Sequence, residues 1–336
     1  MIKEALNLLT EKRDLTEEQM AEAMRDIMEG RATDAQIACF LTALRMKGET
    51  VGEITGAARV MREKVTRIKA PGDTVDTCGT GGDMSRTFNI STTSALVVAA
   101  CGVPVAKHGN RSVSSSCGSA DVLEALGIKI DLEPLKVEKC LQETGFGFMF
   151  APLFHPAMKY AIGPRKEMGI RTVFNILGPL TNPAGAERQV LGVFSDELTG
   201  PMAEVLANLG VRHAFIVHGE DGLDEITNTD RTKISELKDG SIDTYYISPE
   251  DMGLRKARRE DLAGGDAGEN AKITVSILEG EKGPKRDIVI MNAAAALVAG
   301  GRAGDMKEGV EKASAAIDTG AALEKLREIR EVSNSL

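Results

Sequence analysis

The 336-residue sequence contains no tryptophan, and aromatic residues of all kinds make up only 4% of the chain. Platforms of stacked aromatic rings, which bind single-stranded nucleic acids, are therefore not expected. The sequence also lacks an excess of basic residues, because its formal net charge is −9 at pH 7. Since nucleic-acid-binding domains usually present a basic face, this balance argues against a nucleic-acid partner.

Paired cysteines and long apolar runs are missing as well. The cysteines are Cys39, Cys78, Cys101, Cys117 and Cys140. Their odd number and the lack of a CxxC pair favour free thiols in a reducing compartment over a disulfide framework or a zinc site. The N-terminus has no apolar core of signal-peptide length, and residues 95–100 and 288–300 are too short and too rich in alanine and glycine to span a bilayer. We expect a cytoplasmic protein without a membrane partner.

The first 70 residues carry only helix signals. Capping boxes, each a threonine followed three residues later by glutamine or glutamate, begin at Thr16, Thr33 and Thr50. Gly30 and Gly48 stand where helix C-caps belong. These signals predict a module of four helices over residues 1–70.

Short β-like runs alternate with helical runs after residue 70. Strands are predicted at 74–77, 103–107, 146–150, 190–194 and 214–218. Such alternation predicts an α/β domain, residues 71–336, with a mainly parallel sheet covered on both faces. We expect helices from about 154–186 to join the N-terminal module. Residues 221–268 read as polar and irregular, with a strand near 244–247.

A glycine-rich stretch follows the first predicted strand, with glycine at positions 79, 81 and 82 and Asp83 directly after. Glycine lets the backbone approach a ligand and turn N–H groups toward an anion. Residues 89–92 then open a helix, whose free N–H groups offer a second phosphate cradle. The alternative is a tight turn without a ligand. Asp83 would repel phosphate unless a hydroxyl or a metal lies between them.

A second polar loop, residues 107–119, follows the next predicted strand. Lys107 and Arg111 supply positive charge, and Gly109 with the serines supplies hydrogen-bond donors. This set suits a ligand with several phosphates, and a solvated polar loop is the alternative. Because both loops follow the C-terminal ends of strands, we expect them to meet at one edge of the sheet, where α/β folds bind ligands.

Charged residues elsewhere complete the candidate site. Adjacent Asp224 and Glu225, between apolar neighbours, suit magnesium held jointly with phosphate oxygens, although such pairs are also common on surfaces. Arg165 follows a Gly163–Pro164 break that would aim its guanidinium at a substrate carboxylate, and a surface arginine is the alternative. We interpret His155 as a structural residue.

Together these motifs resemble the anthranilate phosphoribosyltransferase family over essentially the whole chain. The matching segments are GTGGD at 79–83, NIST at 89–92, KHGNR at 107–111, GSADVLEALG at 118–127, HPA at 155–157, residues 163–171, NILGPLTNP at 175–183 and LDE at 223–225. The resemblance implies a fold like that of the nucleoside phosphorylases, with the active site between a helical and an α/β domain, and a homodimer formed through the helical domains. It implies a step of tryptophan biosynthesis: 5-phosphoribosyl-1-diphosphate, the donor, and anthranilate, the acceptor, give N-(5-phosphoribosyl)anthranilate and diphosphate.

The resemblance also implies roles for individual residues. Those implied for the donor are Gly79, Gly82, Asp83, Thr87, Asn89, Ile90, Ser91, Thr92, Lys107, His108, Gly109, Asn110, Arg111, Ser112, Val113, Ser114, Ser115 and Ser119. Those implied for anthranilate are Gly79, Asn110 and Arg165. Those implied for magnesium, which we expect as two ions per subunit, are Ser91, Asp224 and Glu225. No general base is assigned, because the aromatic amine is neutral and can attack without prior deprotonation.

Two rival functions fit a similar fold. A pyrimidine nucleoside phosphorylase would need one phosphate site rather than two anion loops and a carboxylate pair. A nucleic-acid-binding relative without the chemistry would be basic and would lack the paired carboxylates. Asp224, Glu225 and the net charge of −9 favour the transferase over both rivals.

Overall fold

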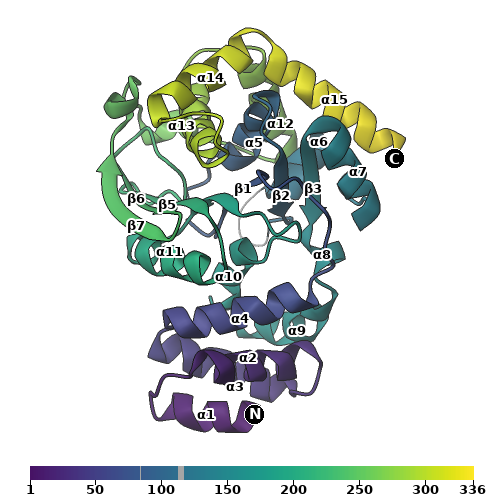
Figure 1. The fold of residues 1–336 in the computed structure, drawn as a ribbon, viewed down its shortest axis with the longest axis vertical. Helices are drawn as coiled ribbons and strands as arrows, with labels where there is room; N and C mark the ends of the chain where they lie inside the picture. Colours follow the sequence, from purple (N-terminus) through teal and green to yellow (C-terminus); the bar gives the residue numbers. More distant parts are fainter. Residues whose placement is uncertain (84, 113–116) are drawn as a thin grey trace.

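The structure is a computed structural model that describes residues 1–83, 85–112 and 117–336. A helical module forms one end of the molecule, and a larger α/β region forms the rest (Figure 1). The module contains α1 (Ile2–Thr10), α2 (Glu17–Met28), α3 (Asp34–Lys47) and α4 (Val51–Lys64). All three predicted capping boxes are formed, at Thr16, Thr33 and Thr50, so the prediction of four helices is confirmed.

A seven-stranded sheet in the order β3-β2-β1-β4-β5-β6-β7 forms the centre of the α/β region. The strands are β1 (Val75–Gly79), β2 (Val105–Gly109), β3 (Phe146–Phe150), β4 (Arg188–Gly192), β5 (His213–Gly219), β6 (Thr232–Lys238) and β7 (Ser241–Ile247). The first five strands pair in parallel, and β6 and β7 pair antiparallel. The predicted mainly parallel sheet is therefore confirmed.

The expectation of an irregular stretch over residues 221–268 is wrong for β6. This strand is rich in polar residues, which hid it in the sequence, but its neighbours satisfy them. The hydroxyl of Ser235 lies 2.9 Å from that of Thr244 on β7, and Glu236 accepts a hydrogen bond from Tyr245 at 2.8 Å. Cross-strand pairs of this kind stabilise a polar strand that local hydrophobicity does not reveal.

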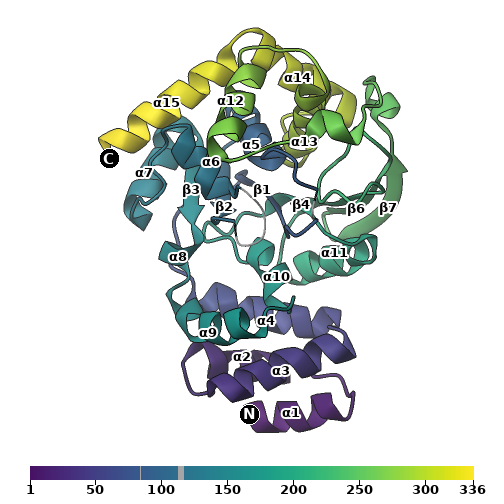
Figure 2. The same ribbon diagram turned by 180° about the vertical axis from the view of Figure 1, so that it is seen from behind.

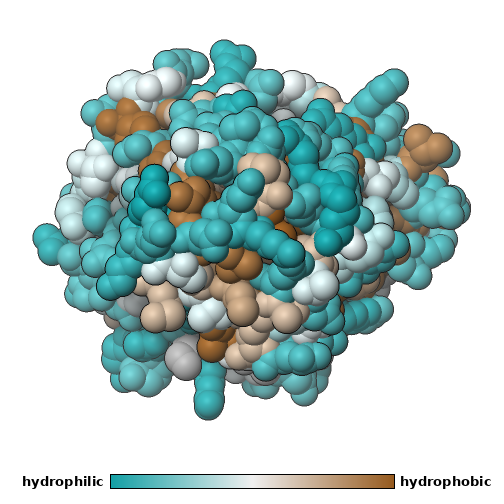
Figure 3. Space-filling model, turned by 90° about the horizontal axis from the view of Figure 1, so that it is seen from below, coloured by the Kyte–Doolittle hydropathy of each residue, from teal (hydrophilic) through white to brown (hydrophobic). Residues whose placement is uncertain are grey.

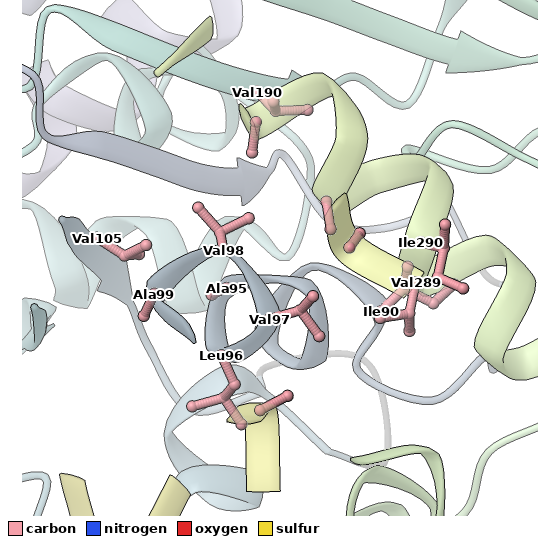
Figure 4. Packing of buried hydrophobic residues seen from close by; sticks show 14 of the residues in the cluster. Ile90, Ala95, Leu96, Val97, Val98, Ala99, Val105, Val190, Val289 and Ile290 are labelled. Carbon is pink, nitrogen blue, oxygen red and sulfur yellow. The ribbon is translucent and has the colours of Figure 1, made fainter. Parts of the chain in front are cut away.

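Helices cover both faces of the sheet (Figure 2). They are α5 (Ile90–Ala100), α6 (Ser119–Ala125), α7 (Pro134–Thr144), α8 (Ala151–Phe154), α9 (Lys159–Met168), α10 (Phe174–Leu177), α11 (Thr199–Asn208), α12 (Ala267–Leu278), α13 (Pro284–Ala299), α14 (Met306–Asp318) and α15 (Ala321–Ser335). On one face, α5 and α13 pack against each other and against the strands, as Figure 4 shows for Val98 and Val289 among others. On the other face lies α11.

The helical module shares an apolar core with the α11 face of the sheet. Met24 and Phe40 of the module belong to the same cluster of buried residues as Leu206 of α11 and Ile216 of β5. The neighbouring Phe215 points to the opposite face and joins the α5–α13 cluster, as the alternation of side chains along a strand requires. After β3 the chain returns to the module, where α9 packs against α2 and α3.

Candidate active site

The two predicted ligand loops lie next to each other in the structure. Strands β1 and β2 are parallel neighbours, and they end at Gly79 and Gly109. A Cβ at Gly109 would overlap the hydroxyl of Ser119 at the start of α6. The second loop therefore folds back closely over the end of its own strand, and this close approach requires glycine.

The carboxylate pair meets the first loop at this edge of the sheet. Leu223 and Ile226 are fully buried and anchor the segment, while Asp224 and Glu225 between them are only partly buried. Asp224 Oδ2 accepts a hydrogen bond of 2.7 Å from the N–H of Gly81, and Glu225 Oε1 accepts one of 3.1 Å from the N–H of Ser91. The structure thus brings together the glycine-rich loop, the N-terminus of α5 and both acidic residues.

Two glycines make room for the acidic segment. A Cβ at Gly79 would overlap the carboxylate of Asp224, and a Cβ at Gly192, the last residue of β4, would overlap the backbone carbonyl of Asp224. Neither glycine has a positive φ, so an alanine could adopt the local backbone. Both positions therefore need glycine for space, which is a requirement that the sequence alone did not reveal for Gly192.

The electrostatics of the pair favour a bound cation. Burial, and then repulsion by Asp83, raises the pKa of Asp224 to about 7. Burial and the charge of Asp224 raise the pKa of Glu225 well above its usual range, and Lys107 opposes this shift. Carboxylate oxygens suit a hard cation such as magnesium. Within residues 1–83, 85–112 and 117–336, no cluster of three or more Asp, Glu, His or Cys side chains could hold a metal by itself. Phosphate or water oxygens would have to complete the coordination.

Lys107 is buried beneath the loops rather than extended toward solvent. Its side chain is 1% exposed, and Nζ donates a hydrogen bond of 2.5 Å to the carbonyl of Thr77. Burial lowers the pKa of this amine, and the nearby carboxylates of Asp76 and Glu225 act in the opposite direction. In this structure Lys107 balances part of the buried negative charge at the site.

Other predicted donor residues between 83 and 92 differ in whether their side chains are hydrogen-bonded or buried in the core. Asp83 accepts a hydrogen bond of 2.6 Å from the hydroxyl of Ser85, which lies 3.3 Å from the hydroxyl of Thr87. The side-chain amide of Asn89 donates to the carbonyl of Cys117 at 3.2 Å. The side chains of Ile90 and Thr92 are buried in the core. These last two residues therefore offer a ligand their backbone rather than their side chains.

In the second loop, Arg111 is already paired. Its Nη1 lies 2.8 Å from carboxylate oxygens of both Asp121 and Glu124, and these hydrogen bonds raise the pKa of the guanidinium. Asp121 also accepts a hydrogen bond of 3.1 Å from the N–H of Ser112. Asn110 is exposed. The predicted donor residues Val113, Ser114 and Ser115 lie outside the described part of the chain. A phosphate at Arg111 would have to replace its present partners.

Arg165 remains available for an acidic ligand. It extends from α9, where its guanidinium lies 5.0 Å from the centre of the Phe174 ring, and burial lowers its pKa. Among the described residues it forms no ion pair with a carboxylate. Nearby in sequence, His155 Nε2 lies 3.1 Å from His108 Nε2 of β2, and burial lowers the pKa values of these imidazoles to about 4 and about 3. Both rings are therefore neutral at pH 7.

Arg171, the last residue of the matching stretch 163–171, has no role among the predictions made from the sequence. The structure shows that its guanidinium donates to the backbone carbonyl of Gly82 and lies 4.5 Å from the centre of the Phe194 ring. The N–H of Phe194 in turn donates to the hydroxyl of Thr80 at 3.1 Å. Arg171 thus ties the segment after α9 to the glycine-rich loop. Its place in the matching stretch 163–171 was the only signal for this contact.

Comparisons with known proteins identify the family of this chain. Residues 71–323 match the family described as glycosyl transferase family, a/b domain, and residues 3–65 match its helical bundle domain. Anthranilate phosphoribosyltransferase from Geotalea uraniireducens is 56% identical over 99% of this chain and 100% of its own. The enzyme of the same name from Acetivibrio thermocellus is 57% identical over 100% of this chain and 97% of its own. The chain belongs to the anthranilate phosphoribosyltransferase family.

Solved structures extend the likeness to three dimensions. The family member from Thermus thermophilus superposes with a TM-score of 0.93 at 43% identity, covering 98% of this chain and 99% of that one. The one from Saccharomyces cerevisiae, solved in complex with PRPP and Mg, superposes with a TM-score of 0.90 at 29% identity, covering 100% and 98%. The same yeast protein was also solved with 4-fluoroanthranilate. The predicted fold, a small helical domain and a large α/β domain, is thus confirmed as that of the anthranilate phosphoribosyltransferases.

Proposed function

We propose that this chain transfers the 5-phosphoribosyl group from 5-phosphoribosyl-1-diphosphate to the amine of anthranilate, in tryptophan biosynthesis. The bond from ribose C1 to the diphosphate oxygen breaks, a bond from C1 to the amine nitrogen forms, and the amine then releases a proton. The observation that carries this proposal is the convergence of the glycine-rich loop, the start of α5 and the Asp224–Glu225 pair at one sheet edge. This arrangement supplies N–H donors for phosphates beside oxygen ligands for a cation.

The donor residues of the proposed site are those of the two loops. The glycine-rich loop (Gly79, Gly82, Asp83), Thr87 and residues 89–92 would hold the ribose and diphosphate, together with residues 107–115 and Ser119. Ser91, Asp224 and Glu225 would hold magnesium, with two ions per subunit. When bound, magnesium neutralises the negative charge that builds up on the departing diphosphate. Lys107 adds a fixed positive charge beneath the pair, and its burial strengthens that charge's effect.

The acceptor would lie against Arg165, Asn110 and Gly79. Arg165 has no carboxylate partner among the described residues, and its planar guanidinium can hold the carboxylate of anthranilate through two hydrogen bonds. Holding the neutral amine near C1 supplies the remaining acceleration, because correct positioning replaces a chance encounter.

We further propose that the helical domain comprises residues 1–70 with helices from about 154–186, and that the α/β domain forms the rest of 71–336. The helical domain would form a homodimer. Cys39 and Met46 lie two turns apart on α3, and both are exposed, Met46 by 80%. Figure 3, which looks onto the helical end, shows apolar residues gathered near the middle of that face. Light scattering should give twice the chain mass for the wild type and a smaller mass for Met46→Glu.

The protein would work in the cytoplasm without nucleic acid or membrane partners. Cys39, Cys78, Cys101 and Cys140 are free thiols, which fits a reducing compartment. Among the described residues, no helix is both long enough and apolar enough to cross a membrane.

The loss of anthranilate fluorescence tests the reaction directly. Purified protein, magnesium and the donor should consume anthranilate, and omission of either magnesium or the donor should stop the change. Parallel assays for phosphorolysis of uridine and thymidine, and for DNA retention at moderate salt, test the two rival functions. Consumption of a nucleoside without consumption of anthranilate would refute the proposed transferase.

A further inference from the structure

Asn292, in the middle of α13, contacts the segment that carries the acidic pair. Its Oδ1 accepts a hydrogen bond of 2.9 Å from the N–H of Ile226, and its Nδ2 donates one of 2.8 Å to the carbonyl of the same residue. One side-chain amide thus pairs with both backbone groups of Ile226, as a neighbouring strand would. Ile226 directly follows Glu225.

The surroundings of Asn292 make this contact rigid. The residue is 2% exposed, and Nδ2 also donates to the carbonyl of Ile288 one turn earlier in α13, at 2.9 Å. Helix α13 itself packs against α5, α14 and the strands β1, β4 and β5. The amide therefore has a fixed position relative to the sheet, and a buried polar network of this kind specifies one backbone geometry.

The contact of Ile226 with Asn292 holds the acidic segment, residues 223–226, against α13. On the sheet, Gly79 and Gly192 limit where Asp224 can lie, because their missing Cβ atoms leave only enough space for it. Without the amide, the buried N–H and carbonyl of Ile226 would have no partner in this arrangement, and the segment would shift to find one. Any such shift moves the neighbouring carboxylate of Glu225.

We propose that Asn292 is a positioning residue for the metal site: it fixes the backbone that directs Asp224 and Glu225 toward the cation and the diphosphate. It touches no substrate and acts only through Ile226. This inference rests on the proposed function, since it concerns the same cation. Partners that orient metal ligands in this way typically change metal affinity roughly 10- to 100-fold when they are mutated.

A matched pair of variants tests the proposal. Asn292→Leu removes the amide at nearly constant size. Asn228→Leu is the control, because Asn228 is also fully buried and its Nδ2 also bonds to α13, at the carbonyl of Pro284 with 2.8 Å, but it does not flank the acidic pair. The affinity for Mn²⁺ in the presence of diphosphate is measured by electron paramagnetic resonance, which needs no turnover.

We expect Asn292→Leu to bind Mn²⁺ roughly 10-fold or more weakly than the wild type, while Asn228→Leu binds nearly as well as the wild type. The Michaelis constant for the magnesium–donor complex should rise in Asn292→Leu, that for anthranilate should stay constant, and excess magnesium should restore turnover. A folded Asn292→Leu with wild-type Mn²⁺ affinity would overturn the proposal. A wild type that binds no Mn²⁺ with diphosphate would instead overturn the proposed metal site.

Hydrogen exchange on the wild type keeps the test decisive if Asn292→Leu does not fold. The N–H of Ile226 is held by the side chain of Asn292, so it should exchange as slowly as the strand amides of β5. Among the described residues, the N–H groups of the exposed Asp14 and Gly72 donate no hydrogen bond. If Ile226 exchanged as fast as these two residues, the side chain of Asn292 would not fix Ile226, and the proposal would fall.

Discussion

Gly192→Ala should lower turnover strongly, because the added methyl group overlaps the backbone of Asp224, a proposed magnesium ligand. The alanine Cβ would overlap the Asp224 carbonyl, and its three nearest atoms all belong to the backbone of Asp224. Atoms in ordinary contact lie about 3.5–4 Å apart, so the acidic segment must retreat by about 2 Å or more. A misplacement of only about 1 Å at a reacting centre can already lower turnover by about 100-fold.

The same change should also lower stability. Overpacking by one methyl group typically costs about 1–3 kcal/mol. The cost here should reach at least the upper part of that range, because the clash is with backbone atoms and Asn292 holds the same segment. Gly200→Ala is the matched control, since no atom lies within 4 Å of the Cβ it would add to α11. Alanine favours a helix over glycine by up to about 1 kcal/mol, so this control should be neutral or slightly stabilised.

Anthranilate fluorescence gives the turnover of both variants, and thermal unfolding gives their stability. The expected result for Gly192→Ala is a large loss of kcat with a cooperative unfolding transition that remains above the assay temperature. Wild-type kcat in Gly192→Ala would show that the acidic segment moves freely without consequence, and it would refute the proposed dependence of turnover on the position of Asp224. An equal loss in Gly200→Ala would show that the effect is not specific to this contact.

Three other predictions follow from the site. Asp224→Asn and Glu225→Gln should each lower kcat by several orders of magnitude with the fold retained, since each removes a metal ligand; turnover by the double variant, or by the wild type in excess chelator, would contradict this. Arg165→Ala should raise the Michaelis constant for anthranilate but change that for aniline little, because aniline has no carboxylate; equal losses for the two acceptors would remove Arg165 from the acceptor site. Burial lowers the pKa of His155 from 6.5 to about 4, so below pH 6.5 the unfolded chain takes up a proton that the folded chain does not. The contribution of His155 to the free energy of unfolding is therefore fully present above pH 6.5 and is lost as the pH falls toward 4. Between pH 7 and pH 5 this loss is about 2 kcal/mol. The free energy of unfolding of His155→Asn, measured in urea, should depend less on pH than that of the wild type.

The parts of the fold that local patterns encode could be predicted from the sequence. Capping boxes depend on residues three apart, so Thr16, Thr33 and Thr50 correctly located the starts of α2, α3 and α4. Apolar runs located β3 at 146–150, the bounds found in the structure. The strand β6 could not be predicted, because its polar side chains are satisfied by β5 and β7, which are different segments of the chain.

The candidate site likewise has parts that local sequence patterns predict and parts that depend on long-range contacts. The two loops could be placed at one sheet edge, because parallel strands end on the same side. The contacts that fix the geometry there join residues far apart in sequence: Asn292 to Ile226, Arg171 to Gly82, and Gly192 to Asp224. No local pattern marks such pairs. The sequence also suggested two free cations in the second loop, whereas Lys107 is buried and Arg111 is paired with Asp121 and Glu124.

The apolar core shared by the helical module and the α11 face of the sheet has a consequence for protein engineering. Met24 and Phe40 on one side and Leu206 and Ile216 on the other belong to one cluster, so cutting the chain near residue 70 would expose half of a core on each fragment. In a chimera that takes its first 70 residues from a distant relative, the side chains of the two halves of this core would not pack together properly. Exchange of the module should succeed only when the facing residues of α11 and β5 are transplanted with it.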